Sequence, residues 1–136
     1  MLNEQQLTAL KAVVNTIIPP DDYPAGWEAG VGDYLLHQFT RDLQPIFPQY
    51  QQWLAALDDE SCAVHGKVFA ELDSDTQTAL LEKIEQGQIQ TQWNIEPASF
   101  FQMVVVHCAE GFYSNPENGG NKDGIGWQMI GFEVRG

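Results

Sequence analysis

Two short groups of side chains have the chemistry of metal ligands or nucleophiles. Cys62 and His65 are three residues apart, and His107 and Cys108 are adjacent. Zinc sites typically take their ligands in pairs two to four residues apart. Adjacent residues of a helix point about 100° apart, because a turn takes roughly 3.6 residues. His107 and Cys108 are therefore poorly placed to bind one ion or to form a thiolate–imidazole pair, and we expect no metal in this chain.

His107 and Glu110 form a second candidate pair. They are three residues apart and share a face of a helix. A carboxylate and an imidazole that face each other can carry out general acid–base catalysis. Such a pair also holds a neighbouring loop by hydrogen bonds, and a glycine-rich segment follows directly. We expect the structural role, and the alternative is a stand-alone enzyme that uses His107 and Glu110.

The glycine-rich segment, "GGNKDGIG" at residues 119–126, has no enzyme signature. It lacks the ending of a phosphate loop and does not lie between a strand and a helix. Gly119 and Gly120 can take positive φ without steric cost, and Asn121 and Asp123 can cap local amides. Large apolar side chains follow that can pin the returning chain to the bundle: Trp127, Met129, Ile130 and Phe132. We predict a surface loop with a fixed, non-repetitive backbone shape, and such loops usually bind a partner or a ligand.

Length, composition and charge favour one soluble globular domain over residues 1–136. The chain is 43% apolar and carries a net charge of −13, from 19 acidic and 6 basic residues. Nucleic acids and anionic membrane surfaces would repel this charge, so a binding partner should present a basic face. The longest strictly apolar run, residues 53–57, is far too short for membrane insertion.

The N-terminal residues and the cysteines give expectations about the compartment. No basic segment followed by a cleavage site begins the sequence, and it contains no twin-arginine pair. We therefore expect a cytoplasmic protein. With two cysteines, Cys62 and Cys108, we expect two buried free thiols rather than a disulfide.

The apolar spacing predicts an all-α fold of about five helices in an irregular bundle with a Gly/Asn-rich C-terminal loop. The first helix should begin with a capping box at Asn3 and Gln6 and end at Pro19-Pro20. The second is expected from about residue 31 to 43. Residues 49–72 form either one long helix or two shorter ones with a cap at "DDES".

The second half of the chain gives clearer boundaries. Ser74 and Gln77 fit a capping box for the fourth helix, and Gly87 is placed to end it. Residues 88–96 alternate apolar and polar side chains without a partner strand, so we expect an extended connector with Trp93 anchored in the core. The fifth helix should begin at Pro97 and lie centrally, because its apolar residues cover more than half of its circumference.

The C-terminal motif carries a resemblance that covers nearly the whole chain. Its residues are His107-x-x-Glu110-Gly111-Phe112-Tyr113-Ser114-Asn115-Pro116, then Gly119-Gly120-Asn121-x-Asp123-Gly124-x-Gly126-Trp127 and Gly131-Phe132. This pattern resembles the signature of the gluconate 2-dehydrogenase subunit 3 family. The N-terminal half is similar too, in "LTALKAVVNTIIPPDDYPAGWEAGVGDYL" with its "IP" stop and "AGV" entry to the second helix.

The resemblance implies a non-catalytic small subunit. In this family a large flavoprotein of the glucose–methanol–choline type oxidises sugars or alcohols with FAD, and a cytochrome c subunit often completes the complex. The small subunit binds the large one, supports its folding and commonly carries a twin-arginine signal that exports both. This sequence departs from the family in lacking that signal, so a periplasmic complex would require export with a partner.

The resemblance further implies that this chain holds no cofactor and that FAD belongs to the partner. It also implies partner-binding or loop-shaping roles for His107, Glu110, Asn115, Pro116, Gly119, Gly120, Asn121, Asp123, Gly124, Trp127 and Phe132. A self-associating helical protein, a homo-oligomer when isolated, is a further alternative.

Overall fold

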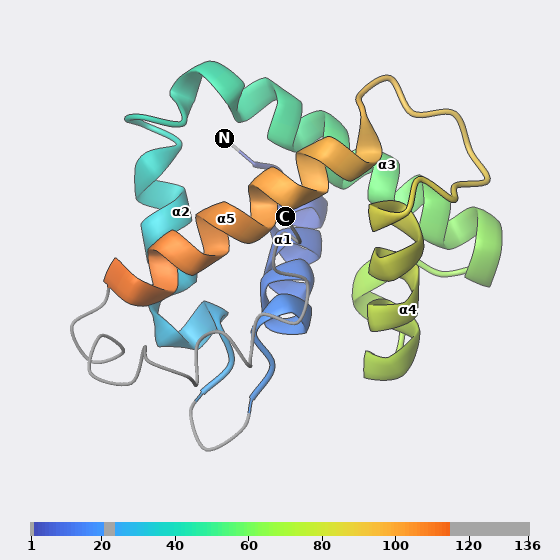
Figure 1. Ribbon diagram of the computed structural model, residues 1–136, viewed down its shortest axis with the longest axis horizontal. Helices are drawn as coiled ribbons and strands as arrows, with labels where there is room; N and C mark the ends of the chain where they lie inside the picture. The colour runs from blue at the N-terminus through green and yellow to red at the C-terminus, as the bar shows by residue number, and fades with distance from the viewer. Residues whose placement is uncertain (1, 21–23, 115–136) are drawn as a thin grey trace.

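The computed structural model describes residues 2–20 and 24–114, and these residues form helices and connecting segments without a strand. The predicted all-α class is confirmed. Five α-helices alternate with short π- and 3-10-helical turns (Figure 1). In chain order they are α1 (Glu4–Ile17), η1 (Trp27–Val31), α2 (Gly32–Gln38), η2 (Gln44–Ile46), α3 (Phe47–His65), η3 (Phe69–Glu71), α4 (Ser74–Glu85) and α5 (Pro97–Ser114). The C-terminal loop that the sequence predicts lies outside the described residues.

Helix α5 is the central element of the bundle. It runs diagonally across Figure 1 and contacts α1, α2, α4 and η1. Val104 and Cys108 are fully buried, and Val105 is 2% exposed, as expected for a helix that is apolar nearly all round. The predicted central position is confirmed. No helix in the described part of the chain is long and apolar enough to cross a membrane.

Helix α1 begins and ends where the sequence predicts. The Asn3 side chain accepts a hydrogen bond from the Gln6 amide, and the Gln6 side chain accepts one from the Asn3 amide. This reciprocal capping satisfies two of the amides that have no partner within the helix. The helix ends at Ile17, just before the Pro19-Pro20 pair.

The second helix begins close to the predicted residue 31 but ends earlier than predicted. The backbone turns through η1, where Gly30 has a φ of 109°, and α2 then ends at Gln38 instead of residue 43. The Thr40 hydroxyl donates to the His37 carbonyl, and the Leu43 amide donates to the Gln38 carbonyl. These bonds replace the regular helical ladder and lead the chain into η2.

Residues 49–72 follow neither predicted alternative. Helix α3 continues through "DDES" and ends at Gly66, whose φ of 76° is the left-handed conformation that favours glycine. The Ser61 hydroxyl donates to the Lys67 carbonyl at 2.6 Å and holds the chain that leaves the helix. The "DDES" residues are therefore helix interior, and residues 66–72 form a separate segment that contains η3.

The start of α4 lies one residue earlier than predicted. The N-cap is Asp73, not Ser74, and its carboxylate accepts the Thr76 amide at 2.8 Å. At the other end Gly87 has a φ of 77°, and the Gln88 amide donates to the Lys83 carbonyl. The predicted glycine stop is confirmed.

The connector from residue 88 to 96 is held by a buried carboxylate that the sequence analysis missed. Glu60 is 1% exposed and accepts hydrogen bonds from the Gln90 amide at 2.7 Å and the Thr91 amide at 3.0 Å. It also accepts the Thr91 hydroxyl and the Trp93 indole N–H. The Trp93 ring packs edge-on against Trp53, with centroids 6.1 Å apart. The extended connector and its tryptophan anchor are thereby confirmed.

One expectation about the cysteines is wrong. Cys108 is buried and free as expected, but Cys62 is exposed, on the outer side of α3. The buried stripe of this helix uses Trp53, Leu57 and Ser61 instead.

Changing Val104 to Asp tests the central position of α5. An unpaired carboxylate at this fully buried site should cost about 3–5 kcal/mol, against a total stability of roughly 5–15 kcal/mol. Val106→Asp is the matched control, because Val106 lies on the same helix and is 44% exposed. Thermal unfolding followed by circular dichroism should show a large loss for Val104→Asp and about 1 kcal/mol or less for the control. Equal losses would contradict the burial of this face.

Changing Glu60 to Gln tests the carboxylate that holds the connector. Burial raises the pKa of Glu60, but hydrogen bonds from Thr91, Gln90 and Trp93 outweigh it and leave the pKa below its usual value. Its stabilising effect is full above the ordinary pKa of about 4.3 and is lost as the pH falls through the lower folded pKa. At neutral pH the variant should lose about 1–3 kcal/mol.

The control for this variant is Glu82→Gln, at an exposed position of α4. Urea unfolding at several pH values should show that Glu60→Gln removes part of the acid-dependent loss of stability, whereas Glu82→Gln keeps it. The buried Asp58 contributes equally to all three proteins and cancels from the comparison. Parallel pH curves for the wild type and Glu60→Gln would show that the Glu60 carboxylate is not bonded as described.

Candidate partner-binding site

The residues that the sequence analysis assigned to the site divide into two sets. His107 and Glu110 lie on the last two turns of α5. Asn115, Pro116, Gly119, Gly120, Asn121, Asp123, Gly124, Trp127 and Phe132 lie outside the described residues. The described part of the site is therefore the end of α5 together with the side chains of α2 and α3 that contact it.

His107 is a buried member of the core. It is 8% exposed, and its Nδ1 lies 2.7 Å from the hydroxyl of Tyr50, a fully buried residue of α3. Burial lowers the pKa of His107, and the nearby Glu110 charge raises it less, so the imidazole is neutral near pH 7. Burial likewise raises the pKa of Tyr50 well above its usual value, so the phenol stays protonated. The contact is a hydrogen bond between two neutral groups.

Glu110 faces a different neighbour. It is exposed, and one carboxylate oxygen accepts a hydrogen bond from the Tyr34 hydroxyl of α2 at 3.4 Å. The pKa of Tyr34 is raised, first by burial and then by the Glu110 charge. His107 and Glu110 share a helix, but one bonds to α3 inside the core and the other to α2 at the surface. In these contacts they do not form an acid–base pair.

Gly111 allows α2 to approach α5 closely. A Cβ atom at this position would lie 2.9 Å from the Tyr34 ring and 3.2 Å from the Tyr34 Cβ. Any larger residue would push Tyr34 away and disturb its bond to Glu110. The glycine of the motif, which the sequence analysis did not explain, therefore has a packing role at the end of α5.

A row of aromatic rings continues from His107 toward the far end of α2. Tyr50 packs edge-on against Phe100 and Phe39, with ring centroids 5.0 and 4.8 Å apart. Phe39 in turn contacts Phe47 at 5.1 Å. The sequence alone does not pair Tyr50 with His107, because 57 residues separate them.

The side chains in this region that could be reactive, such as the Cys108 thiol, are part of the packed core. Burial raises the pKa of Cys108 to about 12, so its sulfur is a protonated thiol near pH 7 and a poor nucleophile. Within residues 2–20 and 24–114, no three His, Cys, Asp or Glu side chains are grouped to hold a metal ion. The end of α5 is held by one buried polar contact, Tyr50–His107, and one exposed polar contact, Tyr34–Glu110.

The described residues define a small, acidic protein of the all-α class. The comparisons make this specific, because the gluconate 2-dehydrogenase subunit 3 family model matches residues 4–134. The chain belongs to the gluconate 2-dehydrogenase subunit 3 family. No curated protein and no solved structure gives a significant match to this chain.

Removing the Tyr50 hydroxyl tests the buried contact of His107. Tyr50→Phe leaves Nδ1 without this partner in the core, which should cost about 1–3 kcal/mol of stability. Tyr34→Phe is the matched control, because it removes the same group from an exposed and longer hydrogen bond. Chemical unfolding should show about 0.5 kcal/mol or less for this control. If both variants unfold like the wild type, His107 does not depend on Tyr50.

Proposed function

We propose that this chain is the non-catalytic small subunit of a flavin-dependent sugar or alcohol dehydrogenase. It binds a large subunit of the glucose–methanol–choline type and supports the folding of that subunit. FAD and the oxidation chemistry belong to the large subunit, and this chain carries no cofactor of its own. A cytochrome c subunit is a further candidate component of the complex.

The observation that carries the proposal is the extent of the family match. It covers residues 4–134, which include the helical body and the motif that begins at His107. A family defined as a subunit of gluconate 2-dehydrogenase supports a role within a dehydrogenase complex.

The chemistry of the described residues supports binding over catalysis. A stand-alone enzyme that uses His107 and Glu110 would need both groups at one substrate. His107 is instead buried against Tyr50, and Glu110 accepts a hydrogen bond from Tyr34. The thiol of Cys108 is fully buried. These contacts fix the end of α5 and present no reactive pair to a ligand.

The net charge supports a partner with a basic contact surface. Nineteen acidic residues against six basic ones would repel nucleic acids and anionic membranes, and they would attract a positively charged protein face.

The complex works in the periplasm if the chain is exported with its partner and in the cytoplasm if it is not.

Co-expression with the large subunit tests the proposed role. The soluble yield and flavin content of the large subunit should both rise when this chain is present, and the two proteins should co-purify. The isolated chain should show no flavin absorbance after desalting. A large subunit that folds and binds FAD equally well alone, and never co-purifies with this chain, would contradict the proposal.

Substitutions in the C-terminal motif test how the complex forms. Asn121→Ala should weaken binding of the large subunit without changing the thermal melt of the helical body, because the family resemblance implies a loop-shaping or partner-binding role for Asn121. Trp127→Ala should lower stability by about 3–5 kcal/mol if the side chain packs fully on the bundle, as the sequence predicts. Melts and pull-downs separate the two effects. Wild-type melts and binding for both variants would show that this motif is not the docking surface.

A further inference from the structure

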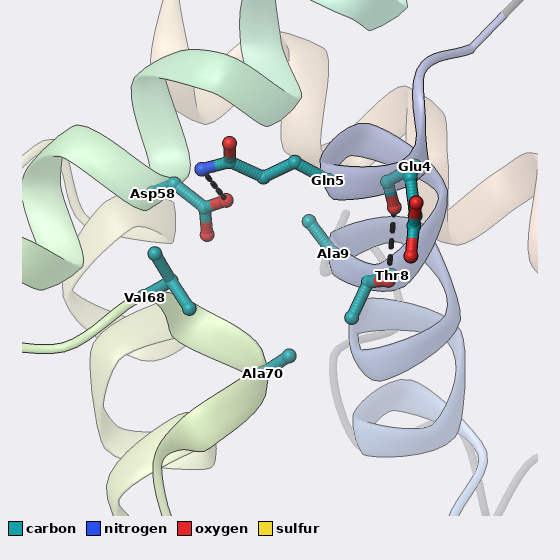
Figure 2. Close-up of a pocket in the computed structure, with 7 residues that line it drawn as sticks. All are labelled: Glu4, Gln5, Thr8, Ala9, Asp58, Val68 and Ala70. Atoms are coloured by element: carbon teal, nitrogen blue, oxygen red, sulfur yellow. Dashed lines mark hydrogen bonds between the residues drawn. The ribbon is translucent and has the colours of Figure 1, made fainter.

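A hollow of about 380 Å³ lies between the first turns of α1 and the segment that contains η3 (Figure 2). It is on a different part of the molecule from the end of α5. Its walls include the small apolar side chains of Ala9, Val68 and Ala70. Its polar lining includes two carboxylates, one of them deeply buried, and an amide: Glu4, Asp58 and Gln5.

Asp58 is the buried carboxylate of this hollow. It is 5% exposed, and it accepts the Phe69 amide at 3.0 Å through one oxygen and the Gln5 side-chain amide at 3.2 Å through the other. Figure 2 shows Gln5 reaching from α1 to the Asp58 carboxylate. An ionised carboxylate offers about four acceptor positions, so two neutral donors leave part of its capacity for a further donor.

The electrostatic surroundings of Asp58 favour a cation. Burial raises its pKa, and the bonds from Phe69 and Gln5 lower it only in part. The charged neighbours that also act on this pKa, Asp59 and Glu71, are both acidic and raise it further. A positive group placed in the hollow would offset these unfavourable terms.

We propose that this hollow receives an arginine side chain of the large subunit, whose guanidinium pairs with the Asp58 carboxylate. The inference rests on the proposed function, because it names a contact with that partner. The charge of −13 favours a basic partner surface, and the apolar walls suit the methylene stem of a long cationic side chain. Guanidinium is less strongly hydrated than ammonium and can donate two parallel bonds to a carboxylate, so arginine fits better than lysine.

A titration of the isolated chain tests the chemistry of the hollow. N-acetyl-arginine amide should shift the amide NMR signals of Phe69 and Ala70 saturably. N-acetyl-citrulline amide, which has nearly the same shape without the charge, should not. Asp58→Asn should abolish the shifts, whereas Asp59→Asn should keep them, because Asp59 is exposed on the next position of α3. Circular dichroism melts establish that both variants are folded. No shift, or equal shifts with citrulline or in Asp58→Asn, overturns the inference.

Binding of the large subunit tests the identity of the occupant. Asp58→Asn should raise the Kd about tenfold or more, as expected when one member of a desolvated charge pair is neutralised, while Asp59→Asn should change it little. Equal affinities of the wild type and Asp58→Asn would overturn the inference and leave the proposed function standing. A wild-type chain that does not bind the large subunit would overturn both.

Discussion

Burial of α5 determines how the other helices pack. Most of its circumference is buried and only a narrow stripe that includes Val106 and Glu110 is exposed, so α1, α2, α4 and η1 pack against its remaining sides (Figure 1). Glycines permit this where helices approach closely, as Gly111 does for Tyr34. The Tyr50–His107 bond places one polar contact inside this packing without leaving a buried group unpaired. This packing matters for function because it fixes the position of the end of α5, where the family's C-terminal motif begins.

Local sequence patterns predicted the elements whose boundaries depend on local chemistry. The capping pair of Asn3 and Gln6, the glycine stop at Gly87 and the proline start at Pro97 all act within a few residues, and the structure has them where the sequence places them. The predicted end of the second helix was wrong, because hydrogen bonds beyond Gln38 turn the chain before the apolar spacing is exhausted. An apolar repeat shows which face is buried but not where the ladder of hydrogen bonds stops.

The buried polar contacts could not be predicted, because their partners are far apart in the sequence. Asp58 and Glu60 read as part of a solvated acidic run, yet one bonds to Phe69 and Gln5 and the other holds the connector through Gln90 and Thr91. No spacing rule joins residues 30 or 50 positions apart. The site motif was found through its resemblance to a family, and of its residues the structure describes His107, Glu110 and the four that follow up to Ser114.

In the proposed complex this acidic helical chain would meet its partner at two separate places. One begins at the end of α5, where His107 and Glu110 are held by different helices. The other is the hollow beside Asp58, between α1 and η3. Two contacts on different elements would align the large subunit along the bundle and would explain why the family match covers residues 4–134 and not the motif alone.

Native mass spectrometry of the co-expressed pair is the sharpest test of the proposed complex. We expect an ion whose mass is the sum of this 15.2 kDa chain, the large subunit and one FAD, and we expect FAD to stay with the large subunit when the complex dissociates. Separate ions for the two proteins under conditions that preserve other complexes, or FAD bound to this chain alone, would show that the complex does not form as proposed.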